Sequence, residues 1–511
     1  MIYPVIYLAY ALIIIAFLRV RPDAGSKNRW SDIIVCLLIG ALTVLTFDTS
    51  PLAKGIYDGD ASVFMYIGRM MQRGYVPYRD MFDHKGPWLY FIEWFGLLGG
   101  VTGLWILEWI CVSLSSYLIF LITGLYTEDK RARYITVFGL IFIAGIHLYE
   151  GGNYTEVWSL PLACLSLYIF LKFLEQKIYS SRAIVAAGAS FMAVFLLRCN
   201  LIAVWVVFIP VIIIELIRQK RSREIIKCVV LFCAGMIIAF LPVLIYYGYN
   251  NAISDMYKCY WEYNIYYVDS SSSSDTALYV FFLYGKYFLI GWIALIPMVI
   301  KLKGRAVVHL LFAAASIVLD LLSCRPYAHY FVPVIPCFVV PMTLMFSFIY
   351  QKAGKASDDT RKSKAVAAVL AVGIAMTAFA VVYPTFSDNK QKAAGDSELV
   401  TFIENNTEPG DDVYFLFGNG YWSLVSGRYT EQKYFYLYPV TYNDELCDDM
   451  LRSIKDNPPD YIIAPIKWND IEEVRRIGNG WERPVTGIDK VCSELGYTKT
   501  AKGSFLCYSL K

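Results

Sequence analysis

The stretch that decides the fold is YDGDASVFMYIGRMMQRGYVPYRDMFDHKGPWLY, residues 57–90, which lies between long apolar runs. Charge is expensive to keep near a bilayer, so a charged cluster in such a chain indicates a functional site. Two aromatic-rich pieces, Val63–Met71 and Trp88–Leu98, are predicted to be helices that lie along the membrane surface. We interpret the loop as one wall of an active site that faces away from the cytoplasm. Its charged residues include Asp58, Asp60, Asp80, Asp83, His84 and Lys85.

The composition of the chain predicts a membrane protein. Of its 511 residues, 57% are hydrophobic and 17% are charged, and the mean hydropathy is +0.47. A soluble protein is nearer half apolar and a quarter charged. The apolar excess is gathered in runs of roughly 16–24 residues, the length that crosses a ~30 Å hydrocarbon core. The formal net charge of +3 is small, and we expect a lipid bilayer and no nucleic acid as partner.

The apolar runs predict about 12 transmembrane helices in residues 1–387. Alternate connections between them are basic, which places those connections in the cytoplasm and both termini outside. The longest outer loop is 48–102, and it contains the opening stretch. The predicted spans are Ile2–Leu18, Asp32–Phe47, Gly103–Leu125, Tyr134–Leu148, Val157–Phe173, Ala183–Leu197, Leu201–Ile217, Ile225–Tyr247, Ala277–Ile300, Ala306–Leu322, Phe331–Tyr350 and Ala365–Tyr383.

Residues 388–511 differ from the rest because they are polar and alternate between two kinds of pattern. Short β-type runs are predicted at Asp412–Phe417, Tyr461–Pro465 and Phe505–Leu510, with helices at Asp396–Asn406, Asp444–Asp456 and Asn469–Ile477. We expect a small extracytoplasmic α/β domain, within the normal size range. Its three cysteines can form one disulfide or remain free thiols: Cys447, Cys492 and Cys507.

The acidic residues of the opening stretch have functional and structural interpretations. Asp58 and Asp60 can ligate a divalent cation through their oxygens, Asp60 can act as a catalytic base, or it can cap a helix. Further on, Asp83, His84 and Lys85 can hold an anionic group and orient a hydroxyl, and Asp80 beside them is a further substrate-binding candidate, as is Asp58. The alternative is a salt-bridged loop.

Polar residues also gather at the outer ends of predicted spans. Glu150 and Glu156 flank the turn 151–153 and either cap helices or accept hydrogen bonds from sugar hydroxyls, with Asn153 as a further substrate-binding candidate between them. Arg198 either snorkels or binds phosphate. Arg325 and His329 are four residues apart and can neutralise a phosphate, with Tyr330 beside them. The alternative for this last segment is an interfacial anchor.

Together these motifs resemble the GT-C membrane glycosyltransferases that use polyprenyl-phosphate-linked sugars, such as protein O-mannosyltransferases and lipid A aminoarabinose transferases. The likeness rests on the acidic first outer loop, its two interfacial helices, the later Arg/His loop and the C-terminal α/β domain. A bacterial branch with PYRDxFDHKGP, GGNxTE and HYF is similar to Pro77–Pro87, Gly151–Glu156 and His329–Phe331. Members of this branch are commonly metal-independent, so no cofactor is implied as required.

The resemblance implies a multi-pass plasma-membrane enzyme that transfers a sugar with inversion. A polyprenyl-phosphate-linked sugar would be the donor, and a glycan, lipid or protein of the cell envelope the acceptor. Asp60 would accept the acceptor's proton, and Arg325 and His329, helped by Lys85, would stabilise the departing phosphate. The alternatives are a flippase or transporter of lipid-linked saccharides, or a polymerase of them.

Overall fold

The computed structural model describes residues 29–53, 59–265, 276–323, 325–356, 397–437, 440–477 and 480–510. The chain divides into two compact units. The first comprises residues 1–52, 105–243 and 273–388, and the second comprises 53–104, 244–272 and 389–511. The predicted spans Ile2–Leu18 and Ala365–Tyr383, and also Asp58, lie outside the described residues.

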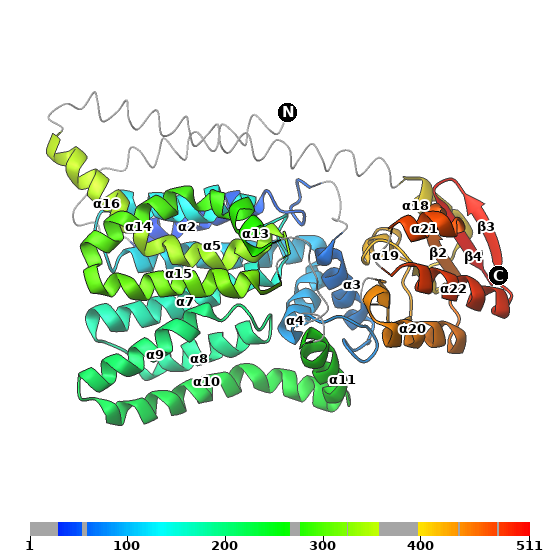
Figure 1. Cartoon of the computed structure of the whole chain (residues 1–511), viewed down its shortest axis with the longest axis horizontal. Helices are drawn as coiled ribbons and strands as arrows, with labels where there is room; N and C mark the ends of the chain where they lie inside the picture. Colours follow the sequence, from blue (N-terminus) through cyan, green and yellow to red (C-terminus); the bar gives the residue numbers. More distant parts are fainter. Residues whose placement is uncertain are drawn as a thin grey trace. The chain divides into compact units, whose positions relative to one another are not determined.

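The first unit consists of helices, which Figure 1 shows as coiled ribbons. It includes most of α5 and of α10. The elements are α2 (Arg29–Val44), α5 (Gly100–Thr123), α6 (Lys130–Phe138), a π-helical turn η2 (Gly139–Ala144), η3 (Gly145–His147), α7 (Thr155–Gln176), α8 (Ser181–Phe195), α9 (Ala203–Arg218), α10 (Ser222–Tyr249), α13 (Ala277–Gly285), η5 (Lys286–Phe288), α14 (Leu289–Leu302), η6 (Lys303–Arg305), α15 (Ala306–Asp320), η7 (Leu321–Ser323), η8 (Ala328–Phe338) and α16 (Val339–Ala356).

Each predicted span within the described residues falls on helical structure. Five stretches are long and apolar enough to cross a membrane: Pro87–Thr123, Thr155–Gln176, Ser222–Tyr249, Ala277–Asp320 and Ala328–Gln351. The chain is therefore a multi-pass membrane protein. The count of about 12 spans stays a prediction.

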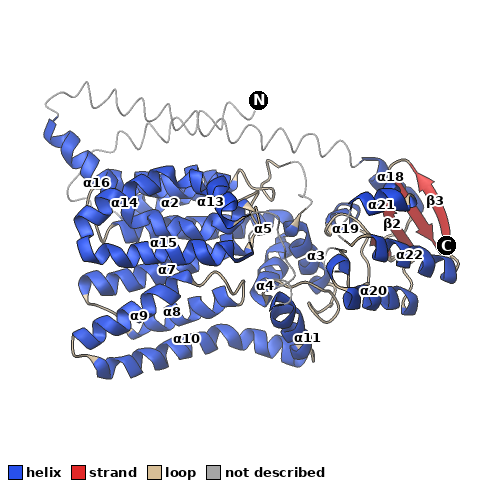
Figure 2. Cartoon of the chain, in the orientation of Figure 1, coloured by secondary structure: helices blue, strands red, loops and turns tan. Residues whose placement is uncertain are grey.

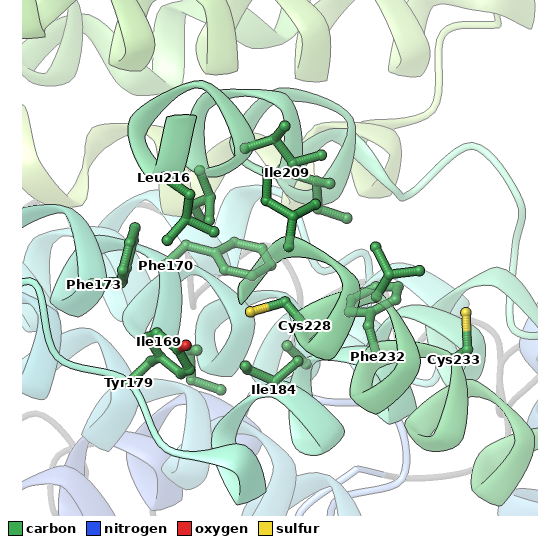
Figure 3. Close-up of a pocket in the computed structure, with 15 residues that line it drawn as sticks. Ile169, Phe170, Phe173, Tyr179, Ile184, Ile209, Leu216, Cys228, Phe232 and Cys233 are labelled. Atoms are coloured by element: carbon green, nitrogen blue, oxygen red, sulfur yellow. The ribbon is translucent and has the colours of Figure 1, made fainter. Parts of the chain in front are cut away.

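Close helix packing within the first unit depends on small residues. Helix α7 packs against α8, α9 and η8, and α15 packs against α9 and η8. A Cβ added at Gly188 of α8 would lie 2.0 Å from the Phe232 carbonyl oxygen of α10, so only glycine permits this approach. A cavity of about 140 Å³ lies among α7, α8, α9 and α10, and Figure 3 shows its apolar lining, which includes Phe170, Ile209 and Phe232.

The second unit combines helices with a small sheet, drawn in red in Figure 2. The strand order is β1-β2-β4-β3, with β1 parallel to β2 and the other two pairs antiparallel. The elements are α3 (Asp60–Gln72), α4 (Pro87–Gly96), η1 (Leu97–Gly99), α11 (Ile253–Tyr257), a π-helical turn η4 (Lys258–Glu262), α18 (Ser397–Asn406), β1 (Val413–Phe415), α19 (Tyr421–Ser426), η9 (Val440–Tyr442), α20 (Asp444–Asp456), β2 (Tyr461–Pro465), η10 (Ile466–Asn469), α21 (Ile471–Ile477), α22 (Glu482–Leu495), β3 (Thr498–Lys502) and β4 (Phe505–Ser509).

The predicted helices and strands of the C-terminal segment are confirmed, with β2 and α20 at the predicted bounds. The sheet and α18 share a buried core that includes Ile403, Val413, Ile463 and Phe505. Strand β3, which was not predicted, is exposed at every residue. The cysteines for which a disulfide was left open are free in the structure: Cys447, Cys492 and Cys507.

Candidate active site

The loop before α4 is held by its own charged residues. Asp80 accepts hydrogen bonds from the Val76 backbone N–H at 2.7 Å and from two nitrogens of Arg79 at 2.7 and 2.8 Å. Partial burial opposes the charge on Asp80, but the Arg79 hydrogen bonds outweigh it and lower the pKa of Asp80. The structure thus gives Asp80 a role in shaping the loop, and its predicted contact with substrate stays a prediction.

Asp83 is a buried carboxylate with three hydrogen-bond donors. The Tyr90 hydroxyl lies at 2.7 Å, the Tyr436 hydroxyl at 3.0 Å and the His84 backbone N–H at 2.7 Å. Burial raises the pKa of Asp83 above its ordinary value, against the opposing effects of the Lys85 charge and of these hydrogen bonds. Because its oxygens are enclosed and occupied, Asp83 is suited to fixing the loop.

A chain of contacts leads from Asp83 to Asp60. His84 Nδ1 lies 3.4 Å from Asp83 Oδ1, and His84 Nε2 lies 3.4 Å from Lys85 Nζ. Lys85 Nζ in turn lies 3.6 Å from Asp60 Oδ2. An ammonium group only donates hydrogen bonds, so Nε2 is the accepting atom in the contact with Lys85.

Accessibility increases along this chain of contacts. The side chains of Asp83, His84 and Lys85 are 3%, 12% and 14% exposed, and that of Asp60 is 49% exposed. Gly59 is the N-cap of α3 and Asp60 is its first residue, so the interpretation of Asp60 as the capping residue is wrong. Its carboxylate still lies at the positive end of the helix dipole. Asp60 is therefore the end of the cluster that a substrate can reach.

The C-terminal segment of the chain supports this cluster from within the same unit. The Phe82 backbone N–H donates to the Lys433 carbonyl at 2.8 Å. Tyr66 of α3 stacks on Phe435 with ring centroids 4.0 Å apart. Together with the Tyr436 hydroxyl on Asp83, these contacts fix the loop against residues 433–436.

In the first unit, the turn at 150–153 has an unusual backbone. Its four residues have φ values of 44°, 87°, 85° and 57°, all in the left-handed region. A Cβ at Gly152 would lie 2.2 Å from Phe47 Cδ2, so the close approach also requires glycine. Glu108 accepts the Asn153 backbone N–H at 2.6 Å. The left-handed backbone and the close packing thus explain why this turn contains two glycines and Asn153.

Arg198 is held between a carboxylate and an aromatic ring. Glu156 is buried in the first turn of α7, where it pairs with Arg198 and accepts the Thr155 hydroxyl at 2.9 Å. On its other side, the Arg198 guanidinium carbon lies 4.0 Å from the Tyr330 ring centroid. A guanidinium has five N–H donors, so this pairing leaves donors for a ligand.

His329 is fixed by Glu150, which also binds the start of η8. Its Nδ1 pairs with the Glu150 carboxylate, and Glu150 accepts the Ala328 backbone N–H at 3.0 Å. The imidazole stacks on Tyr154 at 4.0 Å and meets the Tyr330 ring edge-on at 4.8 Å. With Nδ1 committed to Glu150, Nε2 is the ring atom left for a ligand.

Two clusters therefore contain most of the predicted site residues. In the second unit, Asp60, Asp83, His84 and Lys85 come together. In the first unit, contacts connect the residues of a second cluster: Glu150, Glu156, Arg198, His329 and Tyr330. Arg325 lies three residues before η8 and is partly buried, and Asn153 is placed by the turn that precedes α7.

Several residues of these clusters were not predicted. Glu150 was considered as a helix cap or an acceptor for sugar hydroxyls, but not as the partner of His329. Tyr90 and Tyr436 carried no signal that set them apart from other tyrosines. Asp320 is buried at the end of α15 and interacts electrostatically with Glu156 and Arg198. Its signal was a carboxylate inside an apolar run, which is a functional-site hypothesis by default.

Comparisons with known proteins identify the fold. The family model described as "Putative competence-induced protein Ccs4 N-terminal domain" matches residues 26–384. ArnT from Cupriavidus metallidurans in the apo state aligns with a TM-score of 0.59 at 14% identity, over 95% of this chain and 98% of that one. The same ArnT bound to undecaprenyl phosphate aligns with a TM-score of 0.56 at 15% identity, over the same shares.

A weaker alignment, with a TM-score of 0.46 at 14% identity, is to an oligosaccharyltransferase from Archaeoglobus fulgidus, over 93% of this chain and 73% of that one. A search of curated proteins gives no match. At such low identity the ArnT likeness establishes the fold alone, and this chain has the fold of a GT-C glycosyltransferase.

Proposed function

The chain belongs to the Ccs4 N-terminal domain family, and from this premise and its GT-C fold we propose that it is an inverting glycosyltransferase. The donor is a sugar on a polyprenyl phosphate, and the acceptor is a glycan, lipid or protein of the cell envelope. The undecaprenyl phosphate bound to the similar ArnT supports this class of lipid phosphate. We assign the reaction to the outer face of a bacterial plasma membrane, because the basic connections predict that side.

One observation carries the proposal: Asp60 is the half-exposed end of an otherwise enclosed charged cluster. A general base must reach the proton that it removes, and geometry comes before pKa in choosing it. Asp60 meets this condition, whereas Asp83 is enclosed by two tyrosines and a backbone N–H. We therefore assign Asp60 as the base and Asp83 as a positioning residue.

The proposed step is a single displacement at the anomeric carbon of the donor sugar. The acceptor oxygen forms a bond to this carbon as the bond from the carbon to the phosphate oxygen breaks. Asp60 takes the acceptor's proton, and the bond electrons leave with the polyprenyl phosphate. The ammonium of Lys85 lies 3.6 Å from the Asp60 carboxylate and holds it beside the proposed reaction centre.

We assign the donor phosphate to Arg325 and His329. Negative charge grows on the leaving phosphate, and fixed cationic donors stabilise such charge strongly where water is excluded. His329 is oriented for this by Glu150, which holds Nδ1 and leaves Nε2 available. Arg198, held by Glu156 and Tyr330, is the guanidinium of the cluster that contains His329.

A divalent cation at Asp58 and Asp60 fits the described residues poorly. The group beside the Asp60 carboxylate is the Lys85 ammonium, which occupies the place of a cation and repels a second one. Asp58 lies outside the described residues. We therefore derive no step through a metal ion.

The proposal is tested by incubating the purified full-length protein with a panel of polyprenyl-phosphate sugars and measuring donor consumption. Asp60→Asn should slow consumption ~10²–10⁴-fold. The matched control is Asp448→Asn, since Asp448 is also half-exposed and paired with one cation, Arg483, at 2.7 Å. If no donor is consumed by folded wild-type protein, or if Asp60→Asn consumes donor at the wild-type rate, the proposal is wrong. Transfer of an intact lipid-linked saccharide across a vesicle membrane would favour the flippase alternative.

A further inference from the structure

The second unit contains a cavity of about 330 Å³ that is separate from the Asp60 cluster. Its polar lining comes from the last turn of α3 and its C-cap, and the rest of the lining comes from Met65 of α3, from α5 and α19, and from the chain after α19. None of Asp60, Asp83, His84 and Lys85 lines it. The residues that matter for its chemistry are Arg69, Gln72, Arg73, Val101, Leu424 and Tyr429.

The cavity contains two arginines that keep most of their donors. Arg69 Nη1 donates to the Leu97 carbonyl and to Gln72 Oε1, each at 3.1 Å. The Arg73 guanidinium carbon lies 3.8 Å from the Tyr429 ring centroid, so stacking leaves its N–H edge directed away from the ring face. Over the described part of the chain, neither arginine has a carboxylate at ion-pair distance. Two neighbouring guanidinium groups without a carboxylate favour a shared anion.

The position of the cavity along the chain places it at a membrane surface. Val101 is the second residue of α5, whose 24 residues span ~36 Å and suffice to cross the hydrocarbon core. Just before α5, Trp94, Phe95 and Leu98 are 40%, 59% and 61% exposed. Exposed apolar side chains beside arginines are typical of an interfacial segment, with the charges at headgroup level.

Hydrogen bonds join this apolar surface to the arginines. Gln72 Nε2 donates to the Trp94 carbonyl at 3.1 Å, as Arg69 does to the Leu97 carbonyl. The cationic end of α3 is thus fixed directly against the segment that carries the exposed Trp94 and Leu98. A ligand held by the arginines would have its apolar part beside the hydrocarbon-facing residues.

We propose that this cavity binds the phosphate group of an anionic membrane phospholipid. Arg69 and Arg73 hold the phosphate through charge-assisted hydrogen bonds, and Val101 and Leu424 contact the apolar part of the lipid. Such a site would anchor the second unit at the membrane surface. It does not depend on the proposed glycosyltransferase activity, because it uses none of the residues assigned to that reaction.

The test is native mass spectrometry of the detergent-solubilised full-length protein titrated with phosphatidylglycerol. The double variant Arg69→Gln/Arg73→Gln should bind the lipid at least roughly tenfold more weakly, the loss expected for one charge-assisted hydrogen bond. The matched control is Arg452→Gln, which removes a positive charge from an arginine of the same unit that is 68% exposed. Its affinity for the lipid should equal that of the wild type.

Two further measurements keep the test decisive. If the double variant does not fold, Arg73→Gln alone is the variant to measure, and it should still weaken lipid binding. The Arg73 guanidinium stacks on the Tyr429 ring, so its replacement should leave the fold intact. Inorganic phosphate should bind much more weakly than phosphatidylglycerol. Equal lipid affinity in wild type and in a folded arginine variant, or inorganic phosphate bound as tightly as the lipid, would overturn the proposal.

Discussion

Replacing Asp60 and Asp83 separately by Asn should separate catalysis from stability. Asp60 is half-exposed and has one cationic neighbour, Lys85, so Asp60→Asn should change the free energy of unfolding by only ~0–1 kcal/mol. Asp83 is enclosed and accepts three hydrogen bonds. Asn offers one acceptor oxygen there and turns an NH₂ group toward a donor. Losing one or two charge-assisted bonds of ~1.5–3 kcal/mol each predicts that Asp83→Asn lowers the free energy of unfolding by about 1.5–6 kcal/mol.

The assay measures both quantities on the same purified full-length proteins. Donor turnover by Asp60→Asn should fall ~10²–10⁴-fold, the usual contribution of a positioned base, while its midpoint of thermal unfolding stays close to that of the wild type. Asp83→Asn should unfold at a clearly lower temperature. Tyr436→Phe, which removes one donor to Asp83, should show a smaller decrease of the same kind.

The opposite pattern would refute this reasoning. If Asp60→Asn turns over donor at nearly the wild-type rate while Asp83→Asn is inactive and unfolds like the wild type, then Asp83 is the base. In that case the buried Asp83 would have to become accessible during the reaction, and the choice of Asp60 as the base from its exposure would be wrong.

Three further predictions follow from individual residues. Gly152→Ala should destabilise the protein by at least ~1–3 kcal/mol, seen as a lower midpoint of thermal unfolding, because φ is +85° and the added Cβ would meet Phe47 at 2.2 Å. Burial raises the pKa of Asp412 to about 6, so the folded state binds this proton more tightly than the unfolded state does. The free energy of unfolding of the wild type should therefore decrease by ~2–3 kcal/mol as pH rises from ~4 through 6. Asp412→Asn should not show this decrease when its free energy of unfolding is measured across the same pH range. The same pH dependence in the variant and the wild type would contradict the prediction. Arg325→Ala should weaken donor binding roughly ten- to hundredfold by calorimetry, and an unchanged affinity would move the phosphate site elsewhere.

The sequence alone determined the features whose causes are local. Apolar runs predicted helices because a segment in lipid must satisfy its backbone polar groups within itself, whatever its neighbours are. The helix predicted from Trp88 begins one residue earlier, at Pro87, since proline at the first helical position has no N–H to leave unpaired. In the C-terminal segment, β2 was predicted in full because its five consecutive residues, Tyr461–Pro465, form a short apolar run that contains two β-branched isoleucines.

Only the tertiary structure decided which of the predicted charges can act. Asp83 was enclosed by Tyr436, which is 353 residues away, and His329 was paired with Glu150, which is 179 residues away. Strand β3 likewise has an exposed, polar sequence and is specified by its pairing with β4. Such partners are chosen by packing between distant segments, and no local propensity encodes them. The burial that makes Asp83 a positioning residue, and leaves Asp60 accessible, exists only once those segments have come together.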